Sequence, residues 1–401
     1  MPSTNPYSSV PIPTSSLVRL LSLHLSQFRS FPSLSLDFSG GDVHLLTGPN
    51  GSGKTNVLEA MSVLSLTKSF LGVDEDLLMQ WGTEFYRVRG ECETMDRDSS
   101  GNTVTKLSER KTIEIVSQIS PRRQKAGFIN DVRTPVADLV GTLPAVMFLP
   151  QDLALFSGPP AERRRFLDQL LCQVSPQYLR DLSQYQKLLK QRNALLKSIA
   201  QGRADREDLK VWDIELALAG SSLTLARLEL VETFGVTLTS EVQSLGEKWG
   251  DVRLCFERTG EARGLEELQK EMVTLLAFHR DRDILLQSTT VGPHREDWRV
   301  EADGRDITGF ASRGQQRVCV LSLLFLEASY LELKRGEKPI ILLDDIFSEL
   351  DGDHQQAVLR TFGSSQVFMT STHVPEGLER GAMVWEVERG QIGSPLPAEE
   401  G

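Results

Sequence analysis

A complete P-loop motif constrains the fold of this chain more than any other sequence feature. The pattern G-x-x-x-x-G-K-[ST] is matched in full by Gly48, Pro49, Asn50, Gly51, Ser52, Gly53, Lys54 and Thr55. The apolar run at 43–46 predicts a buried strand before the motif, and the spacing of apolar residues over 57–64 predicts a helix after it. In this order, a strand, a glycine-rich turn and a helix direct backbone N–H groups and the helix dipole at a phosphate.

The motif therefore predicts an ATP site, and each of its side chains has an expected role. We expect Lys54 to reach the β- and γ-phosphates and to act in catalysis, and the Thr55 hydroxyl to coordinate Mg²⁺. Asn56, the first residue of the predicted helix after the motif, completes the expected nucleotide-binding set of residues 48–56.

A second motif ends the apolar run at 340–343 in two carboxylates, Asp344 and Asp345. Four successive apolar residues predict a central parallel strand, and α/β sheets bind ligands beyond the C-terminal ends of such strands. We expect Asp344 to hold the same Mg²⁺ as Thr55, and Asp345 to polarise the attacking water. Taken alone, the pair could equally be an acidic turn; beside a complete P-loop it favours catalysis.

A third motif opens a long predicted helix at Ser312, 264 positions after Gly48 (312 minus 48). A small hydroxyl residue and a glycine place free N–H groups at the start of this helix. In ABC-type ATPases such a motif reaches the γ-phosphate that the other subunit binds. The residues expected to complete the ATP site of a second copy of the chain are Ser312, Gly314, Gln315, Ser348 and Asp351.

The charge distribution leaves nucleic-acid binding open. The net charge of −11 argues against it for the chain as a whole, but residues 161–210 carry eleven Lys/Arg against six Asp/Glu, a local excess of five. Such an excess fits a phosphate-binding patch or, more often, the solvated face of a long helix.

No apolar run approaches the ~18–20 residues that span a bilayer, and no signal peptide or cysteine cluster is present, so we expect a cytoplasmic protein that does not bind membranes.

The predicted fold class is α/β: an ABC-type P-loop ATPase head with a β-rich N-terminal part and an inserted, mostly α-helical arm. We expect disordered tails at 1–16 and 393–401, head segments at 17–160 and 287–392, and the arm at 161–286. Within the arm, helical stretches are predicted at 161–202, 207–245 and 265–286, and a polar span at 94–108 is predicted to be an exposed loop.

Several stretches resemble the RecF family of bacterial recombination-repair proteins, which are ABC/SMC-like ATPases. The resemblance runs from about Leu17 to Gln391, and its most specific stretches are Arg-Arg-Arg-Phe-Leu-Asp at 163–168, Lys-Gln-Arg-Asn at 190–193 and Gly-Pro-His-Arg at 292–295. It implies an ATP-dependent homodimer on gapped DNA or single-strand/double-strand junctions. It also implies weak DNA-dependent hydrolysis of ATP and work with the RecR and RecO mediators in loading the RecA recombinase.

The resemblance also assigns roles to single residues. Gln151 stands where Glu is frequent and is expected to sense Mg²⁺ or the attacking water, whereas His373 is either a γ-phosphate switch or a surface histidine. Leu71 stands where the family often carries Arg, so a charge contact there is absent or replaced. Arg313 stands where Gln is common, and it either contacts phosphate or DNA or is a neutral variant. The basic residues expected to touch DNA are Arg163, Arg164, Lys190 and Arg192. For Arg163 to Arg165, ion pairs that pack the arm on the head are an equal alternative.

Two other classes of protein share parts of this pattern. The nucleotide-binding subunit of a transporter pairs a P-loop with a helix-start signature, but the two motifs lie much closer together and no helical arm separates them. Chromosome-structure proteins carry arms of sustained heptads, which the roughly 125 residues of the arm (161–286) lack. The length of the insertion thus favours the repair ATPase. Asp345 is one methylene shorter than the glutamate common in the superfamily, which predicts slow hydrolysis with ATP acting mainly to hold the dimer.

Overall fold

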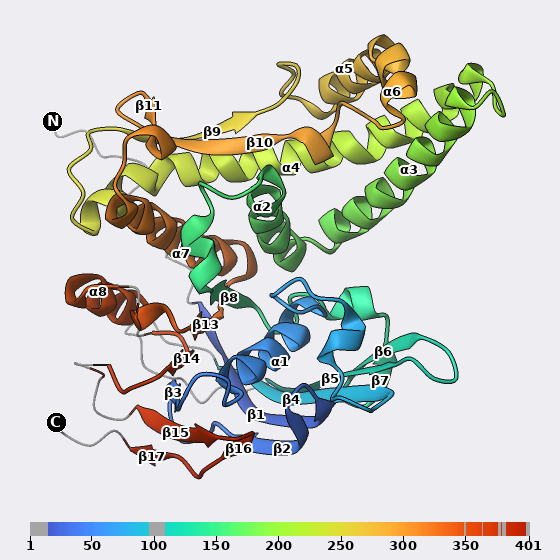
Figure 1. Cartoon of the computed structure of the whole chain (residues 1–401). Coiled ribbons are helices and arrows are strands. Elements are labelled where there is room, and N and C mark those ends of the chain that lie inside the picture. The colour runs from blue at the N-terminus through green and yellow to red at the C-terminus, as the bar shows by residue number, and fades with distance from the viewer. Residues whose placement is uncertain are drawn as a thin grey trace, which may run out of the picture.

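The computed structural model describes residues 15–95, 109–348, 350–362, 364–375, 378 and 382–397. Two lobes are evident in Figure 1: a lower lobe in which strands surround one helix, and an upper lobe of long helices with a small sheet. Most of the predicted 94–108 loop and the outer parts of both predicted tails lie outside the described residues.

The sheet that carries the P-loop has the strand order β16-β15-β3-β14-β13-β8, with β17 on the edge of β15. The neighbouring pairs from β8 to β15 are parallel, and β13 and β14 are buried along their full length. The strands are β3 (Val43–Thr47), β8 (Ala145–Phe148), β13 (Ile340–Asp344), β14 (Val367–Ser371), β15 (Met383–Glu388), β16 (Gln391–Ile392) and β17 (Leu396–Pro397). The predicted C-terminal tail is therefore wrong for residues 396–397, which pair with β15.

A second sheet is mostly antiparallel, in the order β12-β1-β4-β5-β6-β7 with β2 also paired to β1. Its strands are β1 (Ser16–Phe28), β2 (Phe31–Asp37), β4 (Phe85–Met95), β5 (Glu109–Gln118), β6 (Gln124–Ile129), β7 (Val132–Thr134) and β12 (Glu337–Lys338). β1 already begins at Ser16, which the sequence had placed in the N-terminal tail. Helix α1 (Lys54–Leu66) shares one core with both sheets and is buried nearly all round, which explains why it shows no polar face.

The other helices are α2 (Pro160–Val174), α3 (Pro176–Ala200), α4 (Leu209–Ser244), α5 (Leu265–Phe278), α6 (Arg280–Leu286), α7 (Arg313–Arg335) and α8 (Gly352–Phe362). The stretch at 161–202 is thus two helices, because Ser175 is extended and Pro176 can only begin a helix; the Ser175 hydroxyl caps α3 by accepting from the Tyr178 N–H. Likewise, 265–286 is divided at His279. Within the described residues, none of the helices is both long and apolar enough to cross a membrane.

A three-stranded antiparallel sheet, in the order β11-β10-β9, lies along α4 in the upper lobe (Figure 1). It consists of β9 (Val252–Glu257), β10 (Asp297–Ala302) and β11 (Arg305–Asp306). Trp298, Val300 and Ala302 alternate inward and pack into the same core as α4. Residues 297–306 therefore pack with the upper lobe, whereas the sequence had assigned them to the C-terminal head segment.

His44 of β3 makes the stability of the head depend on pH. The side chain is fully buried, its ring stacks on Phe368 with centroids 5.0 Å apart, and its Nε2–H donates to Gly41 O at 3.0 Å. Burial lowers the pKa of His44 to about 4. The unfolded chain, with a histidine pKa of ~6.5, binds more protons than the folded chain between these values, so stability falls as the pH drops through this window.

We expect a His44→Gln variant to take up about one proton fewer than the parent when it unfolds between pH 4 and 6.5. Between pH 6.5 and 4, the loss of stability should shrink by about 3 kcal/mol relative to the parent, at ~1.36 kcal/mol per pKa unit. Urea unfolding at pH 6.5, 5.5 and 4.5 measures this slope. The matched control is His24→Gln on the exposed side of β1, which should keep the parental slope; equal slopes in all three proteins would contradict the assignment.

Candidate nucleotide site

The P-loop follows β3 and has a backbone that only glycine fits at two positions. Gly48 has φ of 153°, and a Cβ there would lie 2.1 Å from Val387 O on β15. Gly53, with φ of 111°, caps the N-terminus of α1, and a Cβ would come within 3.0 Å of Ser30 Oγ. The loop is therefore clamped between β15 and the β1–β2 turn, with the start of α1 behind it.

Lys54 lies along the loop that it is expected to serve. Its Nζ donates to Gly48 O at 2.7 Å and to Pro49 O at 3.0 Å. Burial lowers the pKa of Lys54, while the nearby carboxylates of Asp345 and Asp344 act in the opposite direction. An ammonium held between backbone carbonyls and carboxylates is well placed to turn toward a phosphate, which offers stronger acceptors than the carbonyls do.

Thr55 and Asp344 meet as the sequence predicted. Thr55 Oγ1 lies 2.9 Å from Asp344 Oδ1 and 3.1 Å from Oδ2. They come together because β14 lies between β3 and β13, and the parallel register sets Thr370 beside both Leu46 and Asp344. Motifs 289 positions apart in the chain thus end at one edge of one sheet.

Thr370, at this edge of β14, is a site residue that sequence reasoning missed. Its Oγ1 donates to Asp344 Oδ1 at 2.7 Å and accepts the N–H of Asp345 at 2.9 Å, so one hydroxyl orients both members of the acidic pair. The available signal was a polar residue at the C-terminal end of a fully apolar strand, the same signal that revealed Asp344.

The residues of this edge fit a Mg²⁺–nucleotide complex. Burial raises the pKa of Asp344, while hydrogen bonds from Thr370 and Thr55 act against that rise. Two buried polar atoms, Asp345 Oδ1 and Ser52 Oγ, have no hydrogen-bond partner. Mg²⁺ takes oxygen ligands, usually one or two from the protein and the rest from phosphates and water, and Thr55 with Asp344 provides that share. Accordingly, the described residues contain no cluster of three or more His, Cys, Asp or Glu able to hold a metal alone.

Gln151 lies at the same edge but does not contact the acidic pair. It belongs to a 3-10 turn, η3 (Pro150–Ala154), that follows β8, and β8 pairs with β13 up to Leu343. The exposed Gln151 side chain lines a cavity next to Asp152. His373, two residues beyond β14, is also exposed, with Nδ1 3.2 Å from Thr372 Oγ1. The roles of Gln151 and His373 remain predictions.

The start of α7 is exposed, as a contact to a second chain requires. Ser312 and Gln315 form a capping box: Ser312 Oγ accepts the Gln315 N–H at 3.2 Å, and Gln315 Oε1 accepts the Ser312 N–H at 3.0 Å. Gln315 Nε2 also donates to Glu247. Ser312, Arg313 and Gly314 are open to solvent. In the described part of the chain, neither Ser312 nor Gln315 hydrogen-bonds to the P-loop.

Ser348 and Asp351 lie just past the acidic pair. Ser348 Oγ donates to Asp345 O at 2.8 Å. Asp351 accepts the backbone N–H of His354 at the start of α8, and this hydrogen bond lowers the pKa of Asp351. Both side chains are exposed, so they are free to meet a second chain beside the nucleotide.

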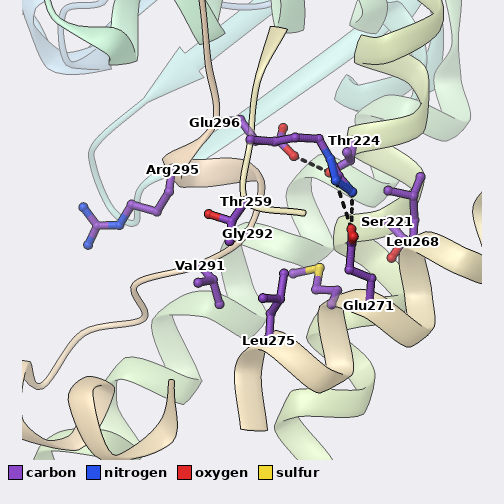
Figure 2. A pocket seen from close by; sticks show the side chains of 12 residues that line it. Ser221, Thr224, Thr259, Leu268, Glu271, Leu275, Val291, Gly292, Arg295 and Glu296 are labelled. Atoms are coloured by element: carbon purple, nitrogen blue, oxygen red, sulfur yellow. Dashed lines mark hydrogen bonds and ion pairs between the residues drawn. The ribbon is translucent and has the colours of Figure 1, made fainter. Parts of the chain in front are cut away.

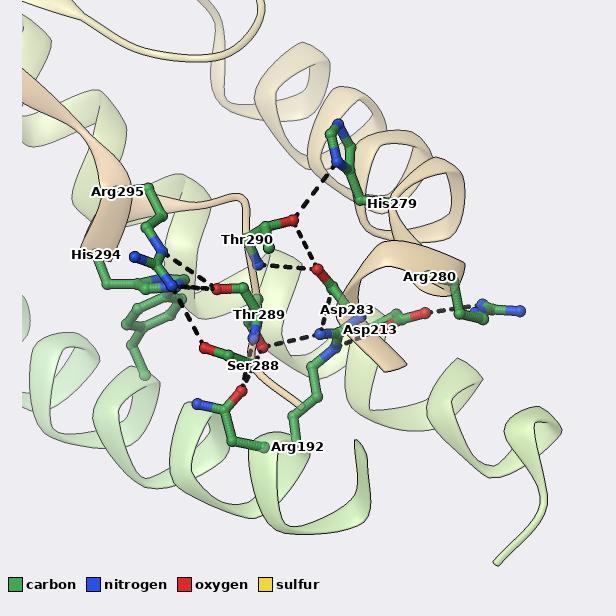
Figure 3. Close-up of polar contacts among 12 residues, drawn as sticks. Arg192, Asp213, His279, Arg280, Asp283, Ser288, Thr289, Thr290, His294 and Arg295 are labelled. Carbon is green, nitrogen blue, oxygen red and sulfur yellow. Dashed lines mark hydrogen bonds and ion pairs between the residues drawn. The ribbon is translucent and has the colours of Figure 1, made fainter. Parts of the chain in front are cut away.

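The structure changes the expectation for two of the four predicted DNA-contacting residues. Arg192 is fully buried: its Nε is 2.8 Å from Asp213 Oδ1 and its Nη1 is 2.7 Å from Asp283 Oδ2 (Figure 3). Arg163 forms a two-pronged pair with Asp297, both contacts at 2.7 Å. The ion-pair alternative is thus observed for Arg163, and the predicted DNA contact by Arg192 is wrong because no part of its side chain reaches solvent.

Other basic groups of the upper lobe do reach the surface. Lys190 is exposed, and Arg164 is half-buried with Nη1 donating to Glu296 O at 2.8 Å. Arg295 is exposed and projects away from a small pocket between α4 and α5 (Figure 2). That pocket, of about 30 Å³, has room for little more than water and is no nucleotide site.

Together, a parallel sheet ending in a P-loop and an acidic pair, an adjoining antiparallel sheet and a signature exposed at the start of α7 define an ATP-binding head of the ABC/SMC type. A family model described as the RecF/RecN/SMC N terminal domain matches residues 19–392. The DNA replication and repair protein RecF of Moorella thermoacetica is 34% identical over 376 residues, which cover 93% of this chain and 95% of that protein. The chain belongs to the RecF family.

Further relatives agree with this assignment. The corresponding protein of Heliobacterium modesticaldum is 33% identical over 387 residues, covering 94% of this chain and 99% of that protein. A solved structure described as the recombination mediator protein RecF-ATPrS in the RecFOR pathway has a TM-score of 0.84 at 27% identity, covering 96% of this chain and all of that one. A RecF-ATP structure gives 0.82 at the same identity, covering 95% and 98%. The transporter and long-coiled-coil interpretations are thereby set aside.

We expect Thr370→Val to weaken Mg²⁺-dependent nucleotide binding by about tenfold while leaving Mg²⁺-free binding within twofold. Valine keeps the shape of the side chain but removes the hydroxyl that donates to Asp344 and accepts the Asp345 N–H. A hydrogen bond to a charged group is worth ~1.5–3 kcal/mol. Titration of a fluorescent ATP analogue with Mg²⁺ or with EDTA measures both affinities. Thr372→Val, on the exposed residue two positions on, is the control; an equal effect of both substitutions would remove Thr370 from the site.

Arg192→Met should lower the free energy of unfolding by about 3–5 kcal/mol, because Asp213 and Asp283 would keep buried charges with less compensation. Lys190→Met, on the exposed face of the same helix, should stay within ~0.5 kcal/mol of the parent. Urea unfolding followed by circular dichroism compares the two. A stable Arg192→Met protein with weakened DNA binding would instead return Arg192 to the DNA-binding surface.

Proposed function

We propose that this chain is an ATP-dependent DNA-binding protein of recombinational repair that dimerises around ATP. The observation that carries the proposal is the split site: the P-loop, Thr55 and Asp344 are assembled within one chain, while the signature at Ser312 faces solvent. Family membership supports it, since the related RecF proteins are described as DNA replication and repair proteins. One chain thus supplies the first half of a site and presents the second half to a partner copy.

The binding step rests on groups already in position. The P-loop N–H groups and Lys54 would hold the phosphates, and Thr55 and Asp344 would hold Mg²⁺, which would neutralise phosphate charge there. Thr370 keeps the Asp344 carboxylate turned toward Thr55. Binding should also move Lys54 Nζ from the loop carbonyls to the phosphates.

For hydrolysis, Asp345 is assigned to polarise the attacking water, and Gln151 to sense Mg²⁺ or that water. The Asp345 backbone is fixed by Thr370 and has φ of 47°, and its Oδ1 is free to accept a proton from water. The short aspartate holds that water less closely than a glutamate would, which accounts for slow turnover. Gln151 approaches from the end of β8 and His373 from the end of β14, so both can sense the γ-phosphate from flanking strands.

Dimerisation follows from the position of the signature. The exposed N–H groups at Arg313 and Gly314 and the Ser312 hydroxyl can bind the γ-phosphate held by the partner copy. Ser348 and Asp351 line the same approach. ATP then holds the dimer together, and hydrolysis removes the bridge and releases DNA.

The proposed dimer binds DNA through the phosphates of the DNA backbone. Among the candidates, Lys190 and Arg164 keep donors available, and Arg295 joins them as an exposed guanidinium. We assign to this chain a gapped or junction DNA substrate, the partners RecO and RecR that the name of the RecFOR pathway indicates, a role in RecA loading, and a cytoplasmic location. The domain proposal keeps 17–160 and 287–392 as the head and 161–286 as the arm, with 297–306 packed on the arm side.

Ser312→Arg tests the split site. The variant should bind ATP within about twofold of the parent but show no ATP-dependent dimer, because a bulky cation would fill the space for the γ-phosphate of the partner copy. Sedimentation velocity with and without a non-hydrolysable ATP analogue measures the dimer, and the ATPase rate is measured with and without gapped duplex DNA. Thr233→Arg, on the exposed face of α4, controls for surface charge. Unchanged dimers of Ser312→Arg would refute the split site.

A further inference from the structure

A cavity of about 240 Å³, with Gln151 on its wall, is bordered by α1, β8, η3, α2 and α7. Apolar and polar groups share its wall about equally. Its apolar residues include Leu66, Phe70, Met147, Leu149, Phe166 and Leu324. A space of this size is far larger than the single-water cavities common in proteins and holds a small organic molecule.

Glu327 of α7 borders this cavity without a partner. The residue is only 6% exposed, yet its carboxylate has no hydrogen bond or ion pair in the described part of the chain. Burial raises the pKa of Glu327 well above its usual range, and repulsion from Asp152 adds to the effect. An acid buried in this way costs stability unless something neutralises its charge.

Three other buried acids among the described residues do have such a partner. Glu59 of α1 is held by Arg29 and Ser69. Glu296, beside β10, is held by Arg227. Asp283 is held by Arg192 (Figure 3). Glu327, by contrast, has no such partner, and it borders a cavity large enough for a ligand.

The charges around the cavity favour a cation. Asp152 and Glu162 line it together with Glu327, against a single guanidinium, Arg165. Arg165 donates to the backbone carbonyl of Phe70, and Asp152 accepts the Leu149 N–H at 2.8 Å. Once Glu327 is ionised, three carboxylates face one arginine, and a cation would offset this excess of negative charge.

The walls decide which kind of cation fits. A metal ion needs several oxygen, nitrogen or sulfur ligands, and the described residues hold no group of three or more acidic, histidine or cysteine side chains that could supply them. We propose that this cavity binds a primary aliphatic amine, with its ammonium group on the Glu327 carboxylate and its hydrocarbon chain against Leu149, Phe166 and Leu324. The ammonium supplies the donors that Glu327 lacks, and the chain covers apolar wall.

The site would connect two parts of the proposed ATP machinery. Asp152 belongs to the same turn as Gln151, and Glu327 lies on the helix that begins beside Ser312. An amine seated between them would stiffen the packing of η3 on α7. The proposal is nevertheless independent of ATP hydrolysis and of DNA binding, because its test needs neither.

The test is calorimetric titration of the full-length, nucleotide-free protein with n-butylamine hydrochloride, with KCl at the same ionic strength as the reference. Saturable binding of one amine per chain is expected. Glu327→Gln should weaken it about tenfold or more, since a charge-assisted hydrogen bond is worth ~1.5–3 kcal/mol. Glu215→Gln, on the exposed face of α4, should bind as the parent does.

Three results would overturn the proposal: no saturable heat with the parent protein, equal heats with KCl and with the amine, or undiminished binding by Glu327→Gln. Retained ATP binding by Glu327→Gln shows that the variant is folded, which is expected because glutamine has nearly the same shape as a protonated glutamate. A second variant, Leu324→Phe, narrows the cavity from the apolar side and should weaken butylamine binding without changing any charge.

Discussion

The hydrogen bonds that Asp344 accepts from Thr55 and from Thr370 are the contacts on which the site depends. Thr370 of β14 orients the Asp344 carboxylate and accepts the Asp345 N–H, while Thr55 joins that carboxylate, at the end of β13, directly to the P-loop that follows β3. This is possible only because β14 lies between those strands in a parallel sheet. The strand order therefore matters as much as the motifs do, and the two sheets packed on α1 hold that order in place.

The upper lobe is held by a different kind of interaction. Buried arginines pair with carboxylates from several elements: Arg192 joins α3 to α4 and α6, and Arg227 joins α4 to α2 and to the segment before β10. Each such pair costs desolvation, and each is destabilising to break on one side only. The family-specific arginine stretches thus serve the architecture at Arg163 and Arg192, while basic groups left at the surface remain for phosphates.

Much of the site could be predicted because its motifs are local. The spacing of the P-loop motif identifies residues 48–56, and the pair Asp344–Asp345 is identified by the apolar strand before it. Ser312 is identified by its place at a helix start. Thr370 carried a weaker form of the signal that revealed Asp344, since a hydroxyl residue after an apolar run, here the first of Thr-Ser-Thr at 370–372, has many explanations until its neighbours are known. The burial of Arg192 could not be predicted either, because an arginine at this place in the sequence fits a DNA contact or a buried ion pair.

The sequence by itself determined the P-loop, the acidic strand, the helical insertion and the resemblance to the RecF family, because each rests on residues close together in the chain. Only the tertiary structure decided what depends on distant neighbours. It divided the first arm helix at Pro176, paired residues 396–397 with β15 and moved 297–306 onto the arm. It also left Glu327 unpaired beside a cavity. Charge pairing and burial are properties of packed surroundings, which no local pattern records.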